Sequence, residues 1–325
     1  MDSTESNQRK HKALKFLLIV VVSAIYTVFV GFSVYRSRSR GFFNFDNATT
    51  NDAILDYRLE INPSPWTFYV VWGCIYLWQF LWLGYSLATL CRSTDYGYLY
   101  VRPNVLPVGI FICFPLMNAC SILWSFLYRS LYIPQACAVL ALMAFLLYIC
   151  VFFSVRALDK HGWKLVKQQK GADIWMIRIF FHNGLGMYAT WCTIATLLNL
   201  ATALVFWADL PNEAACTISL AILASELLVW FVVDITALDK YTRYLLTPYI
   251  VAVFALCGII VQNWNPFTLN FIFNAVLLGV ATVFLLVKFL IALVKCRRDP
   301  LDYKNTGASK SETSYYWRNL TYSDT

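Results

Sequence analysis

The sequence predicts an all-α integral membrane protein, a polytopic transmembrane helical bundle of about eight spans with both termini in the cytosol. Three observations support this prediction. Of the 325 residues, 59% are hydrophobic and only 14% are charged, which is too polar-poor a composition for a soluble globule. Apolar runs of about 20 residues, enough to cross a hydrocarbon core of ~30 Å as a helix, recur along the chain. Lys and Arg gather in alternate connections between these runs.

The runs are continuously apolar, without the alternation of apolar and polar positions that a transmembrane barrel strand requires, so each predicts a helix. The seventh run is the shortest, because polar residues flank it closely, and it contains Pro248. In chain order, the predicted spans are residues 14–35, 66–91, 105–128, 134–155, 179–207, 216–236, 244–263 and 268–295.

These spans divide the chain into three parts. Residues 1–13 form a predicted cytosolic N-terminal tail, and residues 14–298 form the bundle. Residues 299–325 are polar with few apolar side chains, a composition typical of a disordered cytosolic tail.

The orientation of the bundle follows from its basic residues, because short loops rich in Lys and Arg stay on the cytosolic side during insertion. The connection 156–170 is crowded with cations, whereas the connection 208–215 contains none. Three arginines depart from this pattern, since Arg36, Arg38 and Arg40 follow the first span on the side predicted to be external.

Two N-glycosylation acceptor triplets fit the same orientation. The triplet that starts at Asn47 lies in the first external loop, so we expect Asn47 to be glycosylated. The triplet that starts at Asn319 lies in the predicted cytosolic tail and should remain unmodified. Glycosylation requires passage through the secretory pathway, so the sequence favours the plasma membrane or another membrane of that pathway.

The second predicted span is rich in aromatic residues. Pro63 and Pro65 suit the first turn of a helix, where the missing amide donors cost nothing. Phe68, Trp72 and Tyr76 follow at intervals of four residues and therefore share one face of the helix. This stripe predicts either ordinary helix packing or one wall of a ligand pocket, and the spacing by itself favours packing.

The run from Pro63 to Tyr76 resembles the start of the second helix in the tryptophan-rich sensory protein/translocator protein (TspO/MBR) family. That family has a proline-rich start, then Trp-x-Phe, a Trp four residues after the Phe and a Tyr four residues further on. Trp66, Phe68, Trp72 and Tyr76 stand at these positions.

Two other segments are similar to the family to a lesser degree. Trp124, in the third predicted span, lies in a segment like the family's Asn-x-x-Trp-Ser sequence, with Ser121 at the position of the Asn. The segment from Leu246 to Ala255 is similar to the family's Pro-Tyr-x-x-Trp-x-x-Phe-Ala, but Ala252 replaces the Trp. This chain is also longer, because compact family members have five helices.

The resemblance implies a divergent, longer relative that encloses an aromatic pocket for a hydrophobic small molecule of the tetrapyrrole or sterol class. Transport or sensing would be its role, without enzymatic activity and without a resident cofactor. Besides the ligand, the predicted partner is the lipid bilayer, and a homo-oligomer is left open. The net charge of +8 is spread over loops and tails beside the spans, so nucleic acid is not an expected partner. The implied wall residues are Trp66, Phe68, Trp72, Tyr76 and Trp124.

Ionisable residues inside the spans are costly and therefore point to function. Glu226 lies near the middle of the sixth predicted span and joins the candidate ligand-binding residues. An alternative is an ion- or proton-coupled transporter, channel or orphan receptor in which Glu226 acts together with Lys288. The other two ionisable residues within the spans, Asp234 and Lys288, also have structural explanations. Asp234 is close enough to the interface to meet Lys240 or Arg243, and the amine of Lys288 can extend to the cytosolic boundary.

The sequence predicts neither catalytic nor metal-ligating residues. No spacing typical of a zinc site, a phosphate-binding loop or an acyl-transfer enzyme occurs along the chain. His182 lies near the start of the fifth span without a second ligand beside it in sequence, which favours a structural role over haem ligation.

Overall fold

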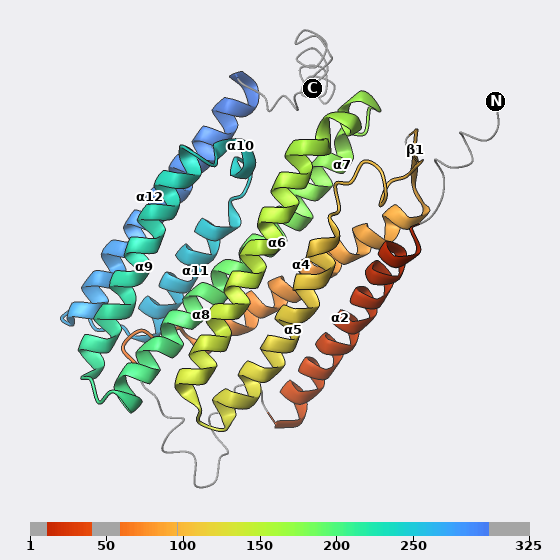
Figure 1. Cartoon of the computed structure of the whole chain (residues 1–325). Helices are drawn as coiled ribbons and strands as arrows, with labels where there is room; N and C mark the ends of the chain where they lie inside the picture. The colour runs from red at the N-terminus through yellow and green to blue at the C-terminus, as the bar shows by residue number, and fades with distance from the viewer. Residues whose placement is uncertain (1–11, 41–58, 96, 299–325) are drawn as a thin grey trace, which may run out of the picture.

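The computed structural model describes residues 12–40, 59–95 and 97–298, which form a bundle of long helices (Figure 1). In this described part the only strands are β1 (Ser93–Thr94) and β2 (Gly97–Tyr98), a short antiparallel pair. The all-α prediction is therefore confirmed. Asn47, Asn319, residues 1–11 and the tail from 299 lie outside the described residues.

Seven of the described helical segments are long and apolar enough to cross a membrane, which confirms a multi-pass membrane protein in contact with lipid. The fifth segment is made of three consecutive helical elements, α7, η1 and α8. The seven segments are α2 (Ala13–Arg40), α4 (Pro65–Cys91), α5 (Val108–Arg129), α6 (Ile133–Lys167), α7 (Gly171–Met176) with η1 (Ile177–Asn183) and α8 (Gly184–Trp207), α9 (Asn212–Ile235) and α12 (Leu269–Arg298).

The remaining predicted span, 244–263, is a shorter apolar helix. Helix α11 (Thr247–Gln262) has 16 residues, about 24 Å at the rise of an α-helix, which is less than a full span. It starts at Thr247 because Pro248 suits the first helical turn, and the short helix α10 (Asp239–Thr242) occupies the connection before it.

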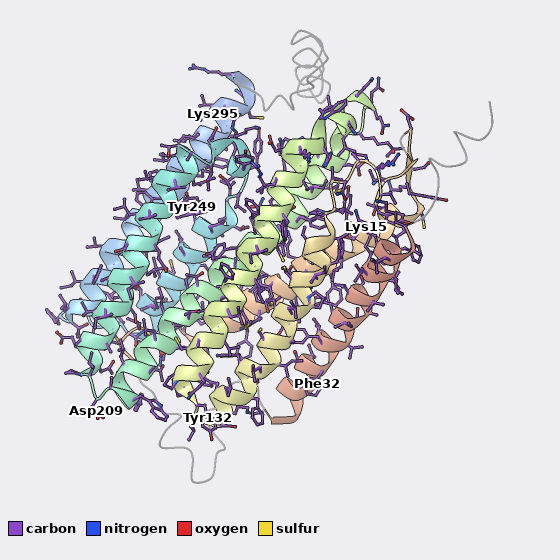
Figure 2. The ribbon with its side chains drawn as sticks, viewed as in Figure 1. Lys15, Phe32, Tyr132, Asp209, Tyr249 and Lys295 are labelled. Atoms are coloured by element: carbon purple, nitrogen blue, oxygen red, sulfur yellow. The ribbon has the colours of Figure 1, made fainter. Side chains whose placement is uncertain are left out.

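Counting α11, the described chain passes along the bundle eight times, and Ala13 and Arg298 therefore lie at the same end. Figure 2 shows Lys15 and Lys295 towards this end and Phe32, Tyr132 and Asp209 at the opposite one. We call the first of these the basic end. The even number of passes brings the two ends of the described bundle to the same side.

Helix α8 occupies the centre of the bundle, packed against α4, α6, α9 and α11. Its attachment to α4 depends on η1, a π-helical turn whose wider hydrogen-bonding pattern changes the backbone acceptors available to neighbours. The indole of Trp78 donates to the carbonyl of Ile179 at 2.8 Å, and the Gln79 amide donates to the carbonyl of Gly184 at 3.0 Å. These bonds hold α4 against the start of α8.

The same turn also positions α11. The Asn183 side chain donates to the carbonyl of Tyr244 at 2.8 Å and accepts from the amides of Leu246 and Thr247 at 3.0 and 3.2 Å. Two amides of the kind a helix start leaves unsatisfied are thereby paired. A Cβ atom at Gly186 would lie 2.7 Å from Leu245, so this glycine permits the close approach of α8 to the start of α11.

Candidate functional site

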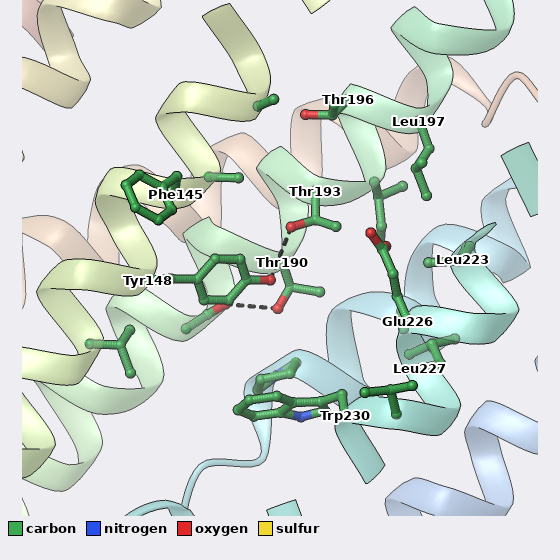
Figure 3. A pocket seen from close by; sticks show the side chains of 18 of the residues that line it. Phe145, Tyr148, Thr190, Thr193, Thr196, Leu197, Leu223, Glu226, Leu227 and Trp230 are labelled. Carbon is green, nitrogen blue, oxygen red and sulfur yellow. Dashed lines mark hydrogen bonds between the residues drawn. The ribbon is translucent and has the colours of Figure 1, made fainter. Parts of the chain in front are cut away.

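A mostly apolar cavity of about 510 Å³ lies between α6, α8, α9 and α11 (Figure 3). Its volume is within the range of roughly 300–1,000 Å³ typical of small-molecule sites. We call it the four-helix cavity. Its larger and polar lining side chains include Phe145 and Tyr148 of α6, Thr190 and Thr193 of α8, and Glu226 and Trp230 of α9.

Helix α8 contributes small polar residues to this cavity at positions that share one face. Thr190, Thr193 and Thr196 follow at intervals of three, and each hydroxyl donates to the carbonyl four residues earlier, at 2.9, 3.1 and 2.7 Å. A threonine hydroxyl that is already bonded to its own helix can face an apolar space at little cost. Their short side chains leave the room that forms the cavity.

Glu226 is the one acidic side chain that lines the four-helix cavity. It lies in the central part of α9, and within the described residues it has neither an ion pair nor a hydrogen bond to its carboxylate. Figure 3 shows its carboxylate directed towards the space in front of α8. Across the cavity, the Tyr148 and Thr193 hydroxyls are hydrogen-bonded to each other at 2.9 Å. A carboxylate at this depth is costly without a partner, so it offers an acceptor to a bound molecule.

The cavity opens through the side of the bundle. Phe145 and Val229, which line it on α6 and α9, are both 61% exposed, and Tyr148 and Val233 are exposed as well. These helices are membrane-spanning segments, so their exposed side chains face lipid. A hydrophobic molecule could therefore reach the cavity from within the bilayer.

Three of the aromatic residues predicted from the sequence lie together, against α8 instead of in the four-helix cavity. The ring of Phe68 meets Trp191 edge-on, with centroids 5.4 Å apart. Trp72 contacts Tyr188 edge-on at 5.7 Å and Tyr76 at 5.5 Å. The shared face predicted from their spacing is thus present, and it packs on the core helix.

The other two predicted aromatic residues lie elsewhere. Trp66 is 43% exposed, and its ring meets Phe254 of α11 edge-on at 5.3 Å. Trp124 packs beside Tyr128, and its indole donates to the Asn199 side chain at 3.4 Å. Of the six candidate ligand-binding residues, Glu226 alone lines the four-helix cavity.

Lys288 and Asp234 form a fully buried ion pair, with the amine 2.8 Å from the carboxylate and both side chains 0% exposed. Tyr249 donates to the same carboxylate at 2.6 Å, and Thr242 also donates to it. The suggested partnership of Lys288 with Glu226 is therefore wrong. The expectation that the Lys288 amine extends to the boundary is also wrong, because Asp234 of α9 gives it a carboxylate partner inside the bundle, and Tyr249 of α11 donates to that carboxylate.

The expected partners of Asp234 have other carboxylates. Lys240 pairs with Asp159 of α6 at 2.6 Å, and Arg243 pairs with Asp239 one turn earlier at 2.7 Å. Lys295 of α12 adds a second ion pair to Asp239 at 3.0 Å. Burial opposes ionisation of Asp239, but the hydrogen bonds and charges of Arg243 and Lys295 outweigh it and lower the pKa of this carboxyl.

Within the described residues, no group of three or more His, Cys, Asp or Glu side chains could hold a metal ion. His182 lies buried in η1, near Arg178, at the edge of a small separate cavity.

Sequence reasoning missed most of the polar lining of the four-helix cavity. The spacing of Thr190, Thr193 and Thr196 on an otherwise apolar span was a usable signal, because it marks one face of one helix. Trp230 is different, because its spacing of four residues from Glu226 predicts that the two share one face of the helix, and both line the cavity. No pattern in the sequence distinguishes Tyr148 from the other aromatic residues of α6.

The family model described as TSPO-like protein matches residues 16–289, a region that extends from α2 into α12. Neither the curated proteins nor the solved structures contain a match. The matched region includes all four helices that line the cavity.

Proposed function

The chain belongs to the TSPO-like family, and from this premise we propose that it binds or carries a hydrophobic small molecule in the four-helix cavity. The observation that carries the proposal is the unpaired carboxylate of Glu226 in a laterally open, apolar space of about 510 Å³. Binding sites of this kind combine an apolar wall with a few polar groups that orient the ligand. We propose binding without catalysis, because the lining offers no nucleophile paired with a general base.

The lining favours a ligand with one polar end that donates a hydrogen bond. Glu226 would accept that bond. The Tyr148 and Thr193 hydroxyls could replace the hydrogen bond between them with a bond to the same ligand group. A flat ring system would pack against Trp230 and Phe145. Of the two ligand classes, a sterol with its single hydroxyl suits these groups better than a tetrapyrrole, whose acidic side chains Glu226 would repel.

In this proposal the aromatic stripe of α4 supports the site without touching the ligand. Phe68 and Trp72 pack on Trp191 and Tyr188, which lie on α8 away from the threonines that line the cavity. Their contacts would hold α8 in place. Trp66, Tyr76 and Trp124 would likewise contribute packing.

The proposal can be tested with the full-length protein in lipid nanodiscs, using energy transfer from tryptophan to the fluorescent sterol dehydroergosterol. We expect saturable transfer, and Glu226→Gln should weaken the affinity by about tenfold, the loss typical of one hydrogen bond to a charged acceptor. Glu213→Gln, an exposed change on the same helix but outside the cavity, is the matched control and should bind like the wild type.

Two outcomes would contradict this assignment. If Trp72→Leu abolished transfer while Glu226→Gln had no effect, the ligand would bind at the aromatic stripe. If protoporphyrin quenched the fluorescence of the wild type and the sterol did not bind, the ligand class would be the tetrapyrroles.

An ion- or proton-coupled transporter, channel or receptor is the second candidate, and the buried Lys288–Asp234 pair favours it. Such pairs inside membrane helices often serve proton or ion pathways. In this reading Glu226 would take up the ion and Lys288 would act through Asp234. A pH-dependent flux in liposomes that Glu226→Gln abolishes, without any sterol or porphyrin binding, would support it over the carrier.

We also propose that the basic end faces the cytosol. Connections at that end contain Lys170, Lys240 and Arg243, and α12 ends there in a basic turn. In this orientation both termini would lie in the cytosol. The membrane we propose is the plasma membrane or another membrane of the secretory pathway.

A further inference from the structure

A second cavity, independent of the four-helix cavity, lies at the basic end of the bundle. Its volume is about 570 Å³, and it is formed by the start of α2, the connection between α4 and α5, and the last turns of α6. We call it the basic-end cavity. These three segments are distant in sequence and come together only in the fold.

The lining of this cavity is strongly cationic. Lys12, Lys15, Arg102 and Lys164 line it together with His161, and no Asp or Glu is among its lining residues. Adjacent like charges repel one another, so this concentration of cations is costly unless an anion is present. The cavity therefore has the electrostatics of an anion site.

Lys15 is the most informative of these residues, because it is only 5% exposed. Its amine donates to the Asn104 side-chain oxygen at 2.8 Å, a neutral acceptor. A buried amine is normally compensated by a carboxylate, as Lys288 is by Asp234. Lys15 has no carboxylate partner in the described part of the chain, so an anionic ligand would supply the missing counter-charge.

An apolar strip on α2 leads away from the cavity. Leu14, which lines the rim, is 71% exposed, and Leu17 and Val21 are exposed at the following positions of the same helix face. An acyl chain could lie along this strip while a charged head occupies the cavity. The cavity is also larger than a simple inorganic anion.

We propose that the basic-end cavity binds a phosphate-bearing head group, supplied by an anionic phospholipid of the adjacent leaflet. Lys12 and Arg102 would contact the phosphate from the rim, and Lys15 would contact it from inside. Basic pockets between transmembrane helices at the cytosolic side recognise phosphoinositide or cardiolipin head groups in this manner. A soluble phosphate ester has the same head chemistry without the chain, so the experiment must separate the two sources.

The test is native mass spectrometry of the detergent-purified full chain, titrated with dioctanoyl phosphatidylinositol 4,5-bisphosphate, dioctanoyl phosphatidylcholine and inositol 1,4,5-trisphosphate. We expect a one-to-one adduct with the phosphoinositide and none with phosphatidylcholine. The double variant Lys12→Gln with Arg102→Gln should lower the affinity for the phosphoinositide at least about tenfold, because it removes two cations near the anionic head group. Both side chains are exposed, so the variant should fold.

Arg297→Gln is the matched control, since Arg297 is an exposed cation of α12 outside the cavity lining, and it should bind like the wild type. Equal binding of inositol trisphosphate and the lipid, both weakened by the double variant, would support the site with a soluble ligand. An equal loss in Arg297→Gln and in the double variant would overturn the proposal, because the attraction would then be general to the basic end. Absence of any phosphate-dependent adduct would also overturn it.

Discussion

Asp239 of α10 connects this short helix to α12 at the basic end of the bundle. Its carboxylate pairs with Arg243 beside it and with Lys295 of α12, and these interactions hold its pKa below the ordinary value of 3.8. A carboxyl whose pKa is lower in the folded protein stabilises the fold above its ordinary pKa. This contribution disappears as the pH falls through the folded pKa.

We therefore predict a pH-dependent cost for Asp239→Asn. At pH 7 the variant should be less stable than the wild type by roughly 1 kcal/mol, a value typical of ion pairs near a surface. Thermal unfolding in detergent between pH 7 and pH 3 measures the difference, which should shrink below about pH 4 as Asp239 becomes protonated in the wild type. Asp209→Asn, an exposed change at the opposite end, is the control. A difference that stays constant down to pH 3 would contradict the assigned role.

Single polar residues also mark the limit of what the sequence could predict. The cost of a carboxylate in a span singled out Glu226, and the structure places it in a cavity. The same reasoning explained Asp234 and Lys288 independently of each other, because each lies near enough to the membrane boundary to reach water or an interfacial partner by itself. Their pairing depends on the relative rotation of α9 and α12, and periodicity within one helix carries no information about its rotation against another.

At the scale of elements, the contact between α4 and α11 is unusually close at Gly258. The amide of Ser64 donates to the carbonyl of Gly258 at 3.1 Å, and a Cβ atom at this glycine would overlap the side chain of Thr67. Thr67 is fully buried and β-branched, so it has little freedom to move away.

Gly258→Ala should therefore destabilise the protein by about 1–3 kcal/mol, the range typical of overpacking in a tight core. Gly279→Ala in α12 is the matched control, because its added methyl group meets nothing within 4 Å, and it should be neutral or slightly stabilising. Unfolding of both variants in denaturant measures the effect. Equal stability of the two variants would mean that α4 and α11 are not in close contact.

The elements themselves were largely predictable, and the exceptions have physical causes. Hydropathy located seven long helices, because each must be continuously apolar to cross lipid. It overestimated the length of the seventh predicted span, 244–263, because residues 244–246 precede the first turn of α11 and Asn263 follows its last one. The spacing of its residues predicted the aromatic stripe of α4. The sequence could not predict that this stripe packs against α8.

At the scale of the whole molecule, the four-helix cavity is formed by α6, α8, α9 and α11, which are four successive passes of the chain along the bundle. The π-helical turn at η1 and the Asn183 side chain fix α8 against α11. Which helices enclose a space is a property of this assembly. The site could therefore be anticipated at one residue, Glu226, but not as a whole.

Locating a bound sterol on the protein tests most directly whether the four-helix cavity is the binding site. A photoactivatable sterol analogue, cross-linked to the full-length protein in nanodiscs and located by peptide mass spectrometry, should label α9 between residues 223 and 233 and α6 between 141 and 151. Excess unlabelled sterol should compete, and Glu226→Gln should reduce the yield at these positions. Competed labelling confined to residues 66–76 of α4, unchanged in Glu226→Gln, would contradict the four-helix cavity as the binding site.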